Sequence, residues 1–470
     1  DSRNNTCIIY NYNPENKMNQ IKGKKIGIIG LGISGFDTGI FLLENGGEVF
    51  ISEKNVNEDI LEKVNILKEK GAKIETGEHT PEFFREVEFV VISPGVDEKN
   101  EFIDFLKKRK IQFISEIELA YNFSKSKKII AITGTNGKTT TTTLIGNIFK
   151  KANYPSVVCG NIGNTFIGEI KNIEEKTWII LEVSSFQLEK IVNFRPYISC
   201  LLNIDYDHFD RYLNMEEYIQ AKKRIFENQK ENDFSVLNFD DYHTKRLLKD
   251  IRSQKRFFSF SKISNGVYYE NENIFLNLDN KNLKILETKN LKIQGKGNIA
   301  NIMASSLISI LCGIEQETIK TAIENFEGLP HRMEKVAEID GVIYINDSKS
   351  TNPHSVKNSV LSLKGKNNII LILGGKDKGF PYHQLTKYLK NRVKFIILLG
   401  EAKERIKKEL ASSNIPMEYV GNLKEAVILS KKVGKKGDFV LFSPGCSSFD
   451  MFKNYEERGD VFKKEVFSLC

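Results

Sequence analysis

A short glycine-rich stretch, GTNGKT at residues 134–139, follows an apolar run that ends at Thr133. Gly134 and Gly137 let backbone N–H groups close around phosphate oxygens, and Lys138 supplies positive charge to the β- and γ-phosphates. The hydroxyl of Thr139 suits the Mg²⁺ ion that accompanies a nucleoside triphosphate. The stretch departs from the full GxxxxGK[ST] pattern, because Ile132 stands at the first glycine position. A plain glycine turn is the alternative, but the Lys-Thr pair favours a phosphate loop.

Acidic residues follow two further apolar runs. Glu182, in LEVSSFQLE, ends one run, where a carboxylate can hold Mg²⁺ opposite a phosphate loop; a surface acid is the alternative. The stretch NIDYDHFDRY gathers Asp205, Asp207, His208 and Asp210. A lone histidine is more often structural, but this composition predicts a cluster for metal or anion binding.

Amide and guanidinium groups come next along the chain. Asn298 and Asn301 lie three residues apart on one face of an expected helix start, where they can read a base or phosphate, or cap the helix. Arg332, in GLPHRMEKV, suits bidentate phosphate contact, with a surface ion pair as the alternative.

Two late motifs, NDSKSTN and SPGCSSFDMFKNYEERG, also end apolar runs. Lys349, Thr351, Ser448 and the nearby backbone N–H groups can receive carboxylates. Cys446 has no evident histidine or asparagine partner, which favours a small packed thiol over a nucleophile.

A second glycine motif, GLGISG, places Gly30, Gly32 and Gly35 after the first apolar run, and Glu53 ends the next. Alone, the motif indicates NAD binding, although it can equally cradle the diphosphate of another nucleotide. The separate phosphate loop makes hydride chemistry the weaker interpretation.

The elements that position these residues alternate along the chain. Runs such as KKIGII, KKIIAIT and NNIILILGG indicate buried parallel strands, with helical patterns between them. Short alternating pieces between about residues 255 and 293 indicate small antiparallel strands. We therefore predict an α/β protein of three domains: a Rossmann-like N-terminal domain (18–116), a central P-loop-type parallel sheet with a small antiparallel addition (117–328) and a Rossmann-like C-terminal domain (329–470). Residues 1–17 are predicted to be an extension outside the fold.

Bulk properties narrow the function classes. The net charge of +8 is spread along the chain, which favours a solvated surface with anion sites over a nucleic-acid binder. The longest apolar runs are too short to span a bilayer, so no membrane insertion is expected. Six cysteines without a CxxC pair argue against structural zinc and a disulfide framework, and indicate a cytoplasmic protein.

Together these motifs resemble the Mur ligases, the ATP-dependent amide-bond ligases of peptidoglycan precursor synthesis. The resemblance runs from about Asn19 to Phe467, and its markers include GNIG at residues 160–163 besides the motifs above. NDSKSTN is the discriminating motif, and it implies the member that joins D-glutamate to UDP-N-acetylmuramoyl-L-alanine.

The resemblance also implies which residues bind each ligand. The UDP part of the substrate would be held by Gly32, Ile33, Ser34, Glu53 (usually aspartate in the family), Ser93, Pro94 and Gly95, and its muramoyl part by Asn161. ATP would be held by Gly134, Thr135, Asn136, Gly137, Lys138, Thr139, Thr140, Asn298, Asn301, Arg332 and Asp347. D-Glutamate would be received by Lys349, Thr351, Lys378, Ser448 and Phe449. Two Mg²⁺ sites would use Thr139, Glu182, His208 and Lys222, and the catalytic residues would be Lys138, His208 and Lys222.

The implied reaction passes through an acyl phosphate and a tetrahedral intermediate, and the family's lysine at Lys222 carries a CO₂-derived carbamate. Without the resemblance, Lys222 is interpreted as a solvated helix lysine. A monomer is expected. Three alternatives remain: an NAD(P)-dependent oxidoreductase, another Mur-type or folylpolyglutamate-type ligase, and a non-catalytic nucleotide-binding module.

Overall fold

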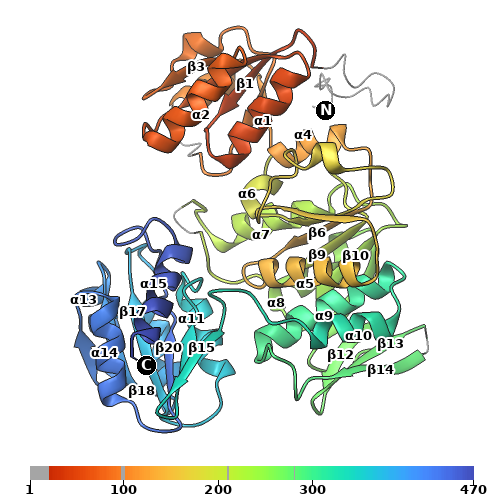
Figure 1. The fold of residues 1–470 in the computed structure, drawn as a ribbon. Helices are drawn as coiled ribbons and strands as arrows, with labels where there is room; N and C mark the ends of the chain where they lie inside the picture. The colour runs from red at the N-terminus through yellow and green to blue at the C-terminus, as the bar shows by residue number, and fades with distance from the viewer. Residues whose placement is uncertain (1–20, 97–100, 209–210, 280, 470) are drawn as a thin grey trace.

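The protein folds into three consecutive α/β blocks, each built on one sheet (Figure 1). The computed structural model describes residues 21–96, 101–208, 211–279 and 281–469. The predicted α/β class with three sheet-based blocks is confirmed. The predicted extension at residues 1–17 lies outside the described residues.

The first block is a five-stranded sheet in the order β3-β2-β1-β4-β5, with every neighbouring pair parallel. Its central strand, KIGII, is almost wholly buried, as expected for an apolar run covered on both faces. Its elements are β1 (Lys25–Ile29), α1 (Ile33–Glu44), β2 (Glu48–Glu53), α2 (Glu58–Glu69), β3 (Lys73–Thr76), the 3₁₀ turn η3 (Pro81–Phe84), β4 (Phe89–Ile92), α3 (Glu101–Lys108) and β5 (Gln112–Ile114).

The central block is a nine-stranded sheet in the order β14-β13-β12-β11-β10-β9-β6-β8-β7. The predicted antiparallel addition is smaller than expected: β11 and β12 pair in parallel, and only β12-β13-β14 are antiparallel. Its elements are α4 (Glu116–Phe123), β6 (Ile129–Thr133), α5 (Lys138–Lys151), β7 (Ser156–Gly160), η4 (Ile170–Asn172), β8 (Trp178–Glu182), α6 (Ser185–Leu188), β9 (Ile198–Leu201), α7 (Met215–Lys223), η5 (Arg224–Phe226), β10 (Phe234–Asn238), α8 (Tyr242–Leu247), η6 (Leu248–Asp250), β11 (Gln254–Ser259), β12 (Gly266–Glu270), β13 (Asn273–Leu278), β14 (Lys281–Glu287), α9 (Lys296–Leu311) and α10 (Gln316–Glu324).

The third block is a six-stranded sheet in the order β15-β16-β20-β17-β18-β19, in which only the β15–β16 pair is antiparallel. Its elements are β15 (Glu334–Ile339), β16 (Val342–Asn346), α11 (Pro353–Ser362), β17 (Ile369–Gly374), η7 (Tyr382–Leu385), α12 (Thr386–Leu389), β18 (Val393–Leu399), α13 (Lys403–Leu410), η8 (Ala411–Ser413), β19 (Met417–Tyr419), α14 (Leu423–Val433), β20 (Phe439–Phe442) and α15 (Tyr455–Phe467).

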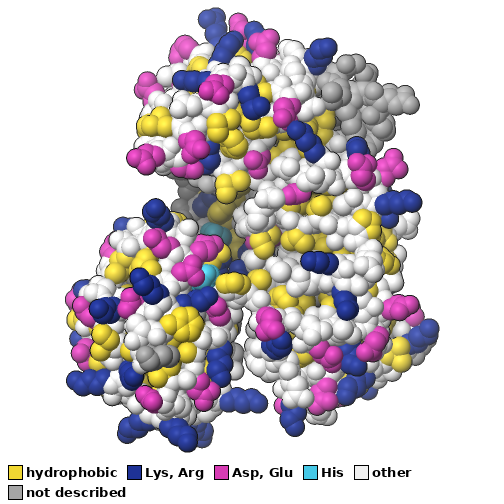
Figure 2. All heavy atoms as spheres, viewed as in Figure 1, with side chains coloured by type: hydrophobic (Ala, Val, Ile, Leu, Met, Phe, Trp, Pro, Cys, Tyr) yellow, Lys and Arg dark blue, Asp and Glu magenta, His cyan; other side chains and the backbone are white. Residues whose placement is uncertain are grey.

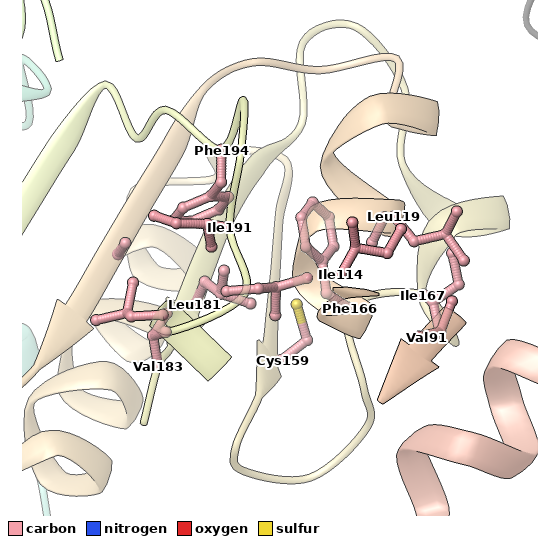
Figure 3. Close-up of a cluster of buried hydrophobic side chains, with 14 of the residues drawn as sticks. Val91, Ile114, Leu119, Cys159, Phe166, Ile167, Leu181, Val183, Ile191 and Phe194 are labelled. Atoms are coloured by element: carbon pink, nitrogen blue, oxygen red, sulfur yellow. The ribbon is translucent and has the colours of Figure 1, made fainter. Parts of the chain in front are cut away.

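The first two blocks share one apolar core. Val91 and Ile114 of the first sheet belong to the same buried cluster as Leu181, Val183 and Phe194 of the central block (Figure 3). Burial on this scale is the dominant stabilising contribution at such a joint. The N-terminal block is therefore fixed to the central block by packing as well as by the chain.

Strand order decides where the chemistry-bearing residues meet. Strand β6 lies between β8 and β9, with all three parallel, so their carboxyl ends reach one edge of the sheet. The phosphate loop, Glu182 and the residues after Leu201 therefore lie side by side. Across the described parts of the chain, every helix falls short of the length and apolar character needed to cross a bilayer.

Candidate active site

The loop between β6 and α5 has the form of a phosphate loop. Gly137, at the N-cap of α5, has a φ of +89°, and a Cβ there would lie 2.3 Å from the Oδ1 of Asn301. Only glycine fits, for conformational and steric reasons. The side chain of Asn203 accepts from the backbone N of Asn136 (2.9 Å) and donates to its carbonyl (3.0 Å). Asn203, which follows the neighbouring strand β9, therefore fixes the position of the loop at Asn136.

Two lysines converge on one carbonyl of this loop. Lys138 Nζ donates to the carbonyl oxygens of Gly134 (2.7 Å) and Thr135 (3.0 Å), and Lys222 Nζ donates to that of Gly134 (3.1 Å). Burial lowers the pKa of Lys138, and burial together with the Lys138 charge lowers that of Lys222 well below its ordinary value. Lys222, on α7, is only 1% exposed, so the interpretation as a solvated helix lysine is wrong.

Glu182, at the end of β8, is buried beside the loop. Its Oε1 accepts from the side-chain amide of Asn161 (3.0 Å), whereas its Oε2 is buried without a hydrogen-bond partner. A buried carboxylate oxygen with no donor is costly unless a cation is bound. Within the described residues no group of three or more His, Cys, Asp or Glu side chains is preassembled for a metal. The donor set therefore fits an Mg²⁺ ion that takes its remaining ligands from phosphate.

A cavity of about 560 Å³, here called the phosphate-loop cavity, lies over these groups. Figure 2 shows a hollow between the third block and the central block, with basic and histidine side chains along it. Residues predicted for ATP, metal and D-glutamate binding come together on its wall with Asn161, which was predicted for the muramoyl part of the substrate: Thr135, Asn136, Gly137, Lys138, Thr139, Thr140, Glu182, His208, Asn298, Asn301, Arg332, Asp347, Lys349 and Thr351.

The third block contacts the phosphate loop directly. The guanidinium of Arg332 donates to the hydroxyl of Thr139 (2.6 Å), and Ser355 Oγ donates to Oδ1 of Asn136 (2.9 Å). Asn352 Nδ2 donates to Oδ2 of Asp207 (3.3 Å). Arg332 therefore faces the phosphate loop rather than forming the alternative surface ion pair.

Two side chains after β16 bring further charge to the cavity. Asp347 accepts hydrogen bonds from three serine hydroxyls, yet burial raises its pKa. Lys349 Nζ lies 3.7 Å from the ring centroid of Tyr455. Burial, and then the Arg332 charge, lower the pKa of Lys349 to about 8.

Asn298 makes no side-chain cap at the start of α9: the N-cap is Gly295, and the Asn298 amide donates to the carbonyl of Gln294 (3.0 Å).

A second cavity, of about 1230 Å³ and here called the interblock cavity, adjoins the first. It is lined by Pro94 and Gly95 of the first block and Lys378 of the third, and His208 lines both cavities. The His208 ring packs against Phe186, with 4.7 Å between centroids. His208 therefore stands where the two cavities meet.

The predicted acidic cluster around His208 is not one site. Asp207 lines the phosphate-loop cavity, but the Asp205 carboxylate pairs with Nδ1 of His354 in the third block. The physical reason is that the loop after β9 turns these two side chains to different partners. Asp210 lies outside the described residues.

The predicted UDP-binding residues Gly32, Ile33 and Ser34 lie on the glycine loop and the start of α1 in the first block, and Glu53 and Ser93 contact this loop from the ends of β2 and β4. Glu53 accepts from the backbone N of Leu31 (2.5 Å) and Asn55 (2.7 Å), and Ser93 Oγ donates to the Gly30 carbonyl (2.9 Å). These side chains shape the loop itself. Neither cavity is lined by Gly32, Ile33, Ser34, Glu53 or Ser93, nor by the D-glutamate candidates Ser448, which is buried, and Phe449, which is exposed.

Two arginines were missed as positioning groups. Arg211 donates to the Pro94 carbonyl (2.9 Å) and to Glu189 (2.9 Å), and its guanidinium lies 4.3 Å from the ring centroid of Phe186. Arg211 belongs to NIDYDHFDRY, in which the sequence marks the acids and the histidine but not the arginine.

Arg458 donates to both oxygens of Ser348 (3.0 and 2.7 Å) and to the carbonyl of Cys446 (3.0 Å). This fully buried guanidinium joins the two late motifs, and no periodicity in the sequence marks it. Cys446 is buried against the hydroxyl of Tyr382, the packed arrangement that was favoured.

Comparisons with known proteins agree with this geometry. Three family models match in chain order: the N-terminal domain of MurD-like Mur ligases (24–115), the Mur ligase middle domain (132–309) and the Mur ligase glutamate ligase domain (331–446). The chain is 42% identical to the UDP-N-acetylmuramoylalanine–D-glutamate ligase of Caldicellulosiruptor bescii, covering 96% of this chain and 98% of that protein. It is 40% identical to the ligase of that name from Clostridioides difficile, covering 96% and 99%.

Solved structures show the same fold at lower identity. A pseudomurein peptide ligase from Methanothermus fervidus aligns with a TM-score of 0.61 and 19% identity, covering 95% of this chain and 100% of that one. The UDP-N-acetylmuramate-alanine ligase of Thermotoga maritima aligns with a TM-score of 0.58 and 19% identity, again covering 95% and 100%.

Proposed function

The chain belongs to the Mur ligase family, and we propose that it joins D-glutamate to the alanyl carboxylate of UDP-N-acetylmuramoyl-L-alanine at the expense of ATP. The reaction serves peptidoglycan synthesis. One observation supports the proposal most strongly: the same cavity is lined by the phosphate loop and by Lys349 and Thr351 of the third block. We place the reaction in the cytoplasm, with a monomer as the working unit.

The two adjoining cavities suggest how the substrates meet. ATP would lie on the phosphate loop, with Lys138 and Arg332 against its phosphates. The uridine-linked substrate would run from the first block through the interblock cavity, past Pro94 and Gly95. Its alanyl carboxylate would then arrive at His208, where the cavities join.

The chemistry follows from bringing anions together. A carboxylate oxygen attacks the γ-phosphorus, the bond to the β-phosphate oxygen breaks, and ADP leaves with an acyl phosphate remaining. The amine of D-glutamate attacks the acyl carbon, and the tetrahedral intermediate expels phosphate as the amide forms. Lys138, Arg332 and Lys349 offset the repulsion between phosphate and carboxylate in both steps.

Thr139, Glu182, His208 and Lys222 would hold the two Mg²⁺ ions, with Lys222 as its carbamate. Bound Mg²⁺ offsets the charge of phosphate and carboxylate oxygens as they approach each other. The unpaired Oε2 of Glu182 supports the assignment. Lys222 is buried beside the loop, and its lowered pKa favours the neutral amine, which is the form that adds CO₂ and releases a proton.

D-Glutamate would enter from the third block. Lys349 and Thr351 line the phosphate-loop cavity, whereas Lys378 lines the interblock cavity. We propose that a closing movement of this block brings Lys378, Ser448 and Phe449 to the amino acid, which also excludes water from the acyl phosphate.

Phosphate release tests the proposal directly. The enzyme would receive MgATP and UDP-N-acetylmuramoyl-L-alanine with D-glutamate, L-glutamate, L-lysine or L-alanine, and we expect release only with D-glutamate. Lys138→Ala should abolish release, whereas Lys151→Ala, at the exposed end of the same helix, should not. Release with another amino acid, or none with D-glutamate, would contradict the assignment.

A further inference from the structure

A third cavity, of about 440 Å³, lies between the central and third blocks and is here called the Tyr388 cavity. One wall is Asp205 and Tyr206, in the loop after β9. The other comes from the start of α11 and the segment 380–390. Apart from Asp205, whose carboxylate is paired with His354, none of the residues predicted for substrate, nucleotide or metal binding lines it.

The lining combines aromatic surface with positive charge. Rings of Tyr206, Phe380 and Tyr388 face the space together with Lys357, Lys387 and Lys390. The Nζ atoms of Lys357 and Lys387 lie 4.8 and 4.9 Å from the ring centroid of Tyr388.

Over the residues that the structure describes, the lysines of this lining are free of direct ion pairs, although the charge of Lys357, after a larger contribution from His354, helps to lower the pKa of Asp205. Among the described residues, Lys357, Lys387 and Lys390 form no ion pair with a carboxylate. Asp205 is the acid of the lining, and its carboxylate is already paired with His354.

The walls of this cavity are tied to the phosphate loop. The Thr135 hydroxyl donates to the Asp205 carbonyl (3.2 Å) and accepts from the Asp205 backbone N (2.9 Å). Ser355, one residue after His354, donates to the side chain of Asn136 (2.9 Å). A ligand that bridges the two walls would therefore stabilise the arrangement in which Thr135 and Asn136 are held.

We propose that the Tyr388 cavity is a regulatory site for a small aromatic anion, whose ring packs among the tyrosines and phenylalanine and whose phosphate or carboxylate meets the lysines. The volume suits a molecule of mononucleotide size or smaller. Because the cavity needs both walls, its ligand and MgADP on the phosphate loop each tighten the binding of the other. This regulatory role goes beyond the amide-forming reaction, and a measurement of ligand binding tests it without an activity assay.

The test uses 8-anilinonaphthalene-1-sulfonate, an aromatic anion that fluoresces in apolar surroundings, titrated into the enzyme saturated with MgADP. We expect one saturable site. The double variant Lys357→Glu/Lys387→Glu should weaken it at least tenfold. The matched control is Lys403→Glu/Lys407→Glu, because these lysines also lie over one tyrosine, Tyr419, at 5.8 and 4.3 Å. That control should change affinity less than twofold.

Displacement by UMP or by 4-hydroxybenzoate distinguishes a phosphate source from a carboxylate source of the ligand. Saturating probe should tighten MgADP at least twofold in the parent and not in the Lys357→Glu/Lys387→Glu variant. The neutral pair Lys357→Gln/Lys387→Gln repeats the test if the acidic pair does not fold. Absence of a saturable site, equal affinities in the two double variants, or no effect on MgADP would each overturn the proposal.

Discussion

Replacing Glu116 by glutamine should make the protein more stable at alkaline pH. Glu116 begins α4, at the joint where the first block meets the central block. Its Oε1 accepts from the backbone N of Ile167 (2.6 Å), but its Oε2 is buried without a partner. Burial, with a smaller contribution from the charge of Asp37, raises the pKa of Glu116 from its ordinary 4.5 to about 7.

The sign and size follow from proton linkage. The folded state holds this proton more tightly than the unfolded state, so stability falls as pH rises from about 4.5 to about 7 and then levels off. A pKa difference of this size lowers the free energy of unfolding by about 3 kcal/mol at alkaline pH. About 2 kcal/mol of this loss develops between about pH 5 and pH 8. Glutamine keeps the acceptor for the backbone N of Ile167 and never ionises. The stability of Glu116→Gln should therefore not show this decrease with rising pH.

Urea unfolding followed by Trp178 fluorescence measures the effect. Trp178 is the single tryptophan and lies on β8, whose Ile179 and Leu181 belong to the core shared with α4. The free energy of unfolding of Glu116→Gln minus that of the parent should rise with pH, because the other titrating groups cancel in the difference.

Glu118 provides a matched contrast on the same helix. Both of its oxygens accept backbone N–H groups, from Val192, Asn193 and Phe194. Glu118→Gln should therefore destabilise the protein at neutral pH, by about 1–3 kcal/mol. A Glu116→Gln difference that is flat with pH, or that falls, would refute the reasoning.

Three further predictions concern the site. Lys222→Ala should be inactive in phosphate release and partly recover with added short carboxylic acids; full activity without them would reject the carbamate. Arg211→Ala should raise the KM for the uridine-linked substrate about tenfold or more, because it frees the loop of Pro94, while MgADP affinity measured by calorimetry stays unchanged; Arg211→Lys should recover little, since lysine cannot make the same contacts. The KM for D-glutamate should rise about tenfold per pH unit above about pH 8, because Lys349 then loses its proton, and Lys349→Arg should flatten that rise; a parallel rise in the variant would count against Lys349.

Local patterns predicted the elements whose form depends on neighbouring residues in the chain. The apolar runs became buried strands, and the Gly-Lys-Thr spacing gave a phosphate loop because a strand, a turn and a helix start are all set within ten residues. Strand direction was harder. Short alternating strands look alike whichever way they pair, so the parallel pairing of β11 and β12 could not be predicted.

Contacts between distant parts of the chain could not be predicted from the sequence either. Asp205 looked like part of a cluster with Asp207, but its partner, His354, comes from another block. Lys222 had a signal that was not used: Tyr218 and Lys222 are four residues apart, so they share one face of α7, and that face is buried. Helical spacing could have predicted the burial, although not the contact with Gly134.

The charge arrangement of the phosphate-loop cavity explains why it needs its ligands. Lys138, Lys222, Arg332 and Lys349 all have lowered pKa values, with burial as the largest cause in each case. Four acids line the same cavity: Glu182, with one oxygen unpaired, Asp207, Glu456, and Asp347, whose pKa burial raises. A phosphate or carboxylate bound beside Lys138, Arg332 or Lys349 favours the charged form of that side chain, which burial disfavours. The proposed carbamylation of Lys222 would have the same effect, since it would place an anion beside Lys138. Burial makes these charged side chains costly in the free protein. The same burial strengthens their attraction for the reactants once these are bound.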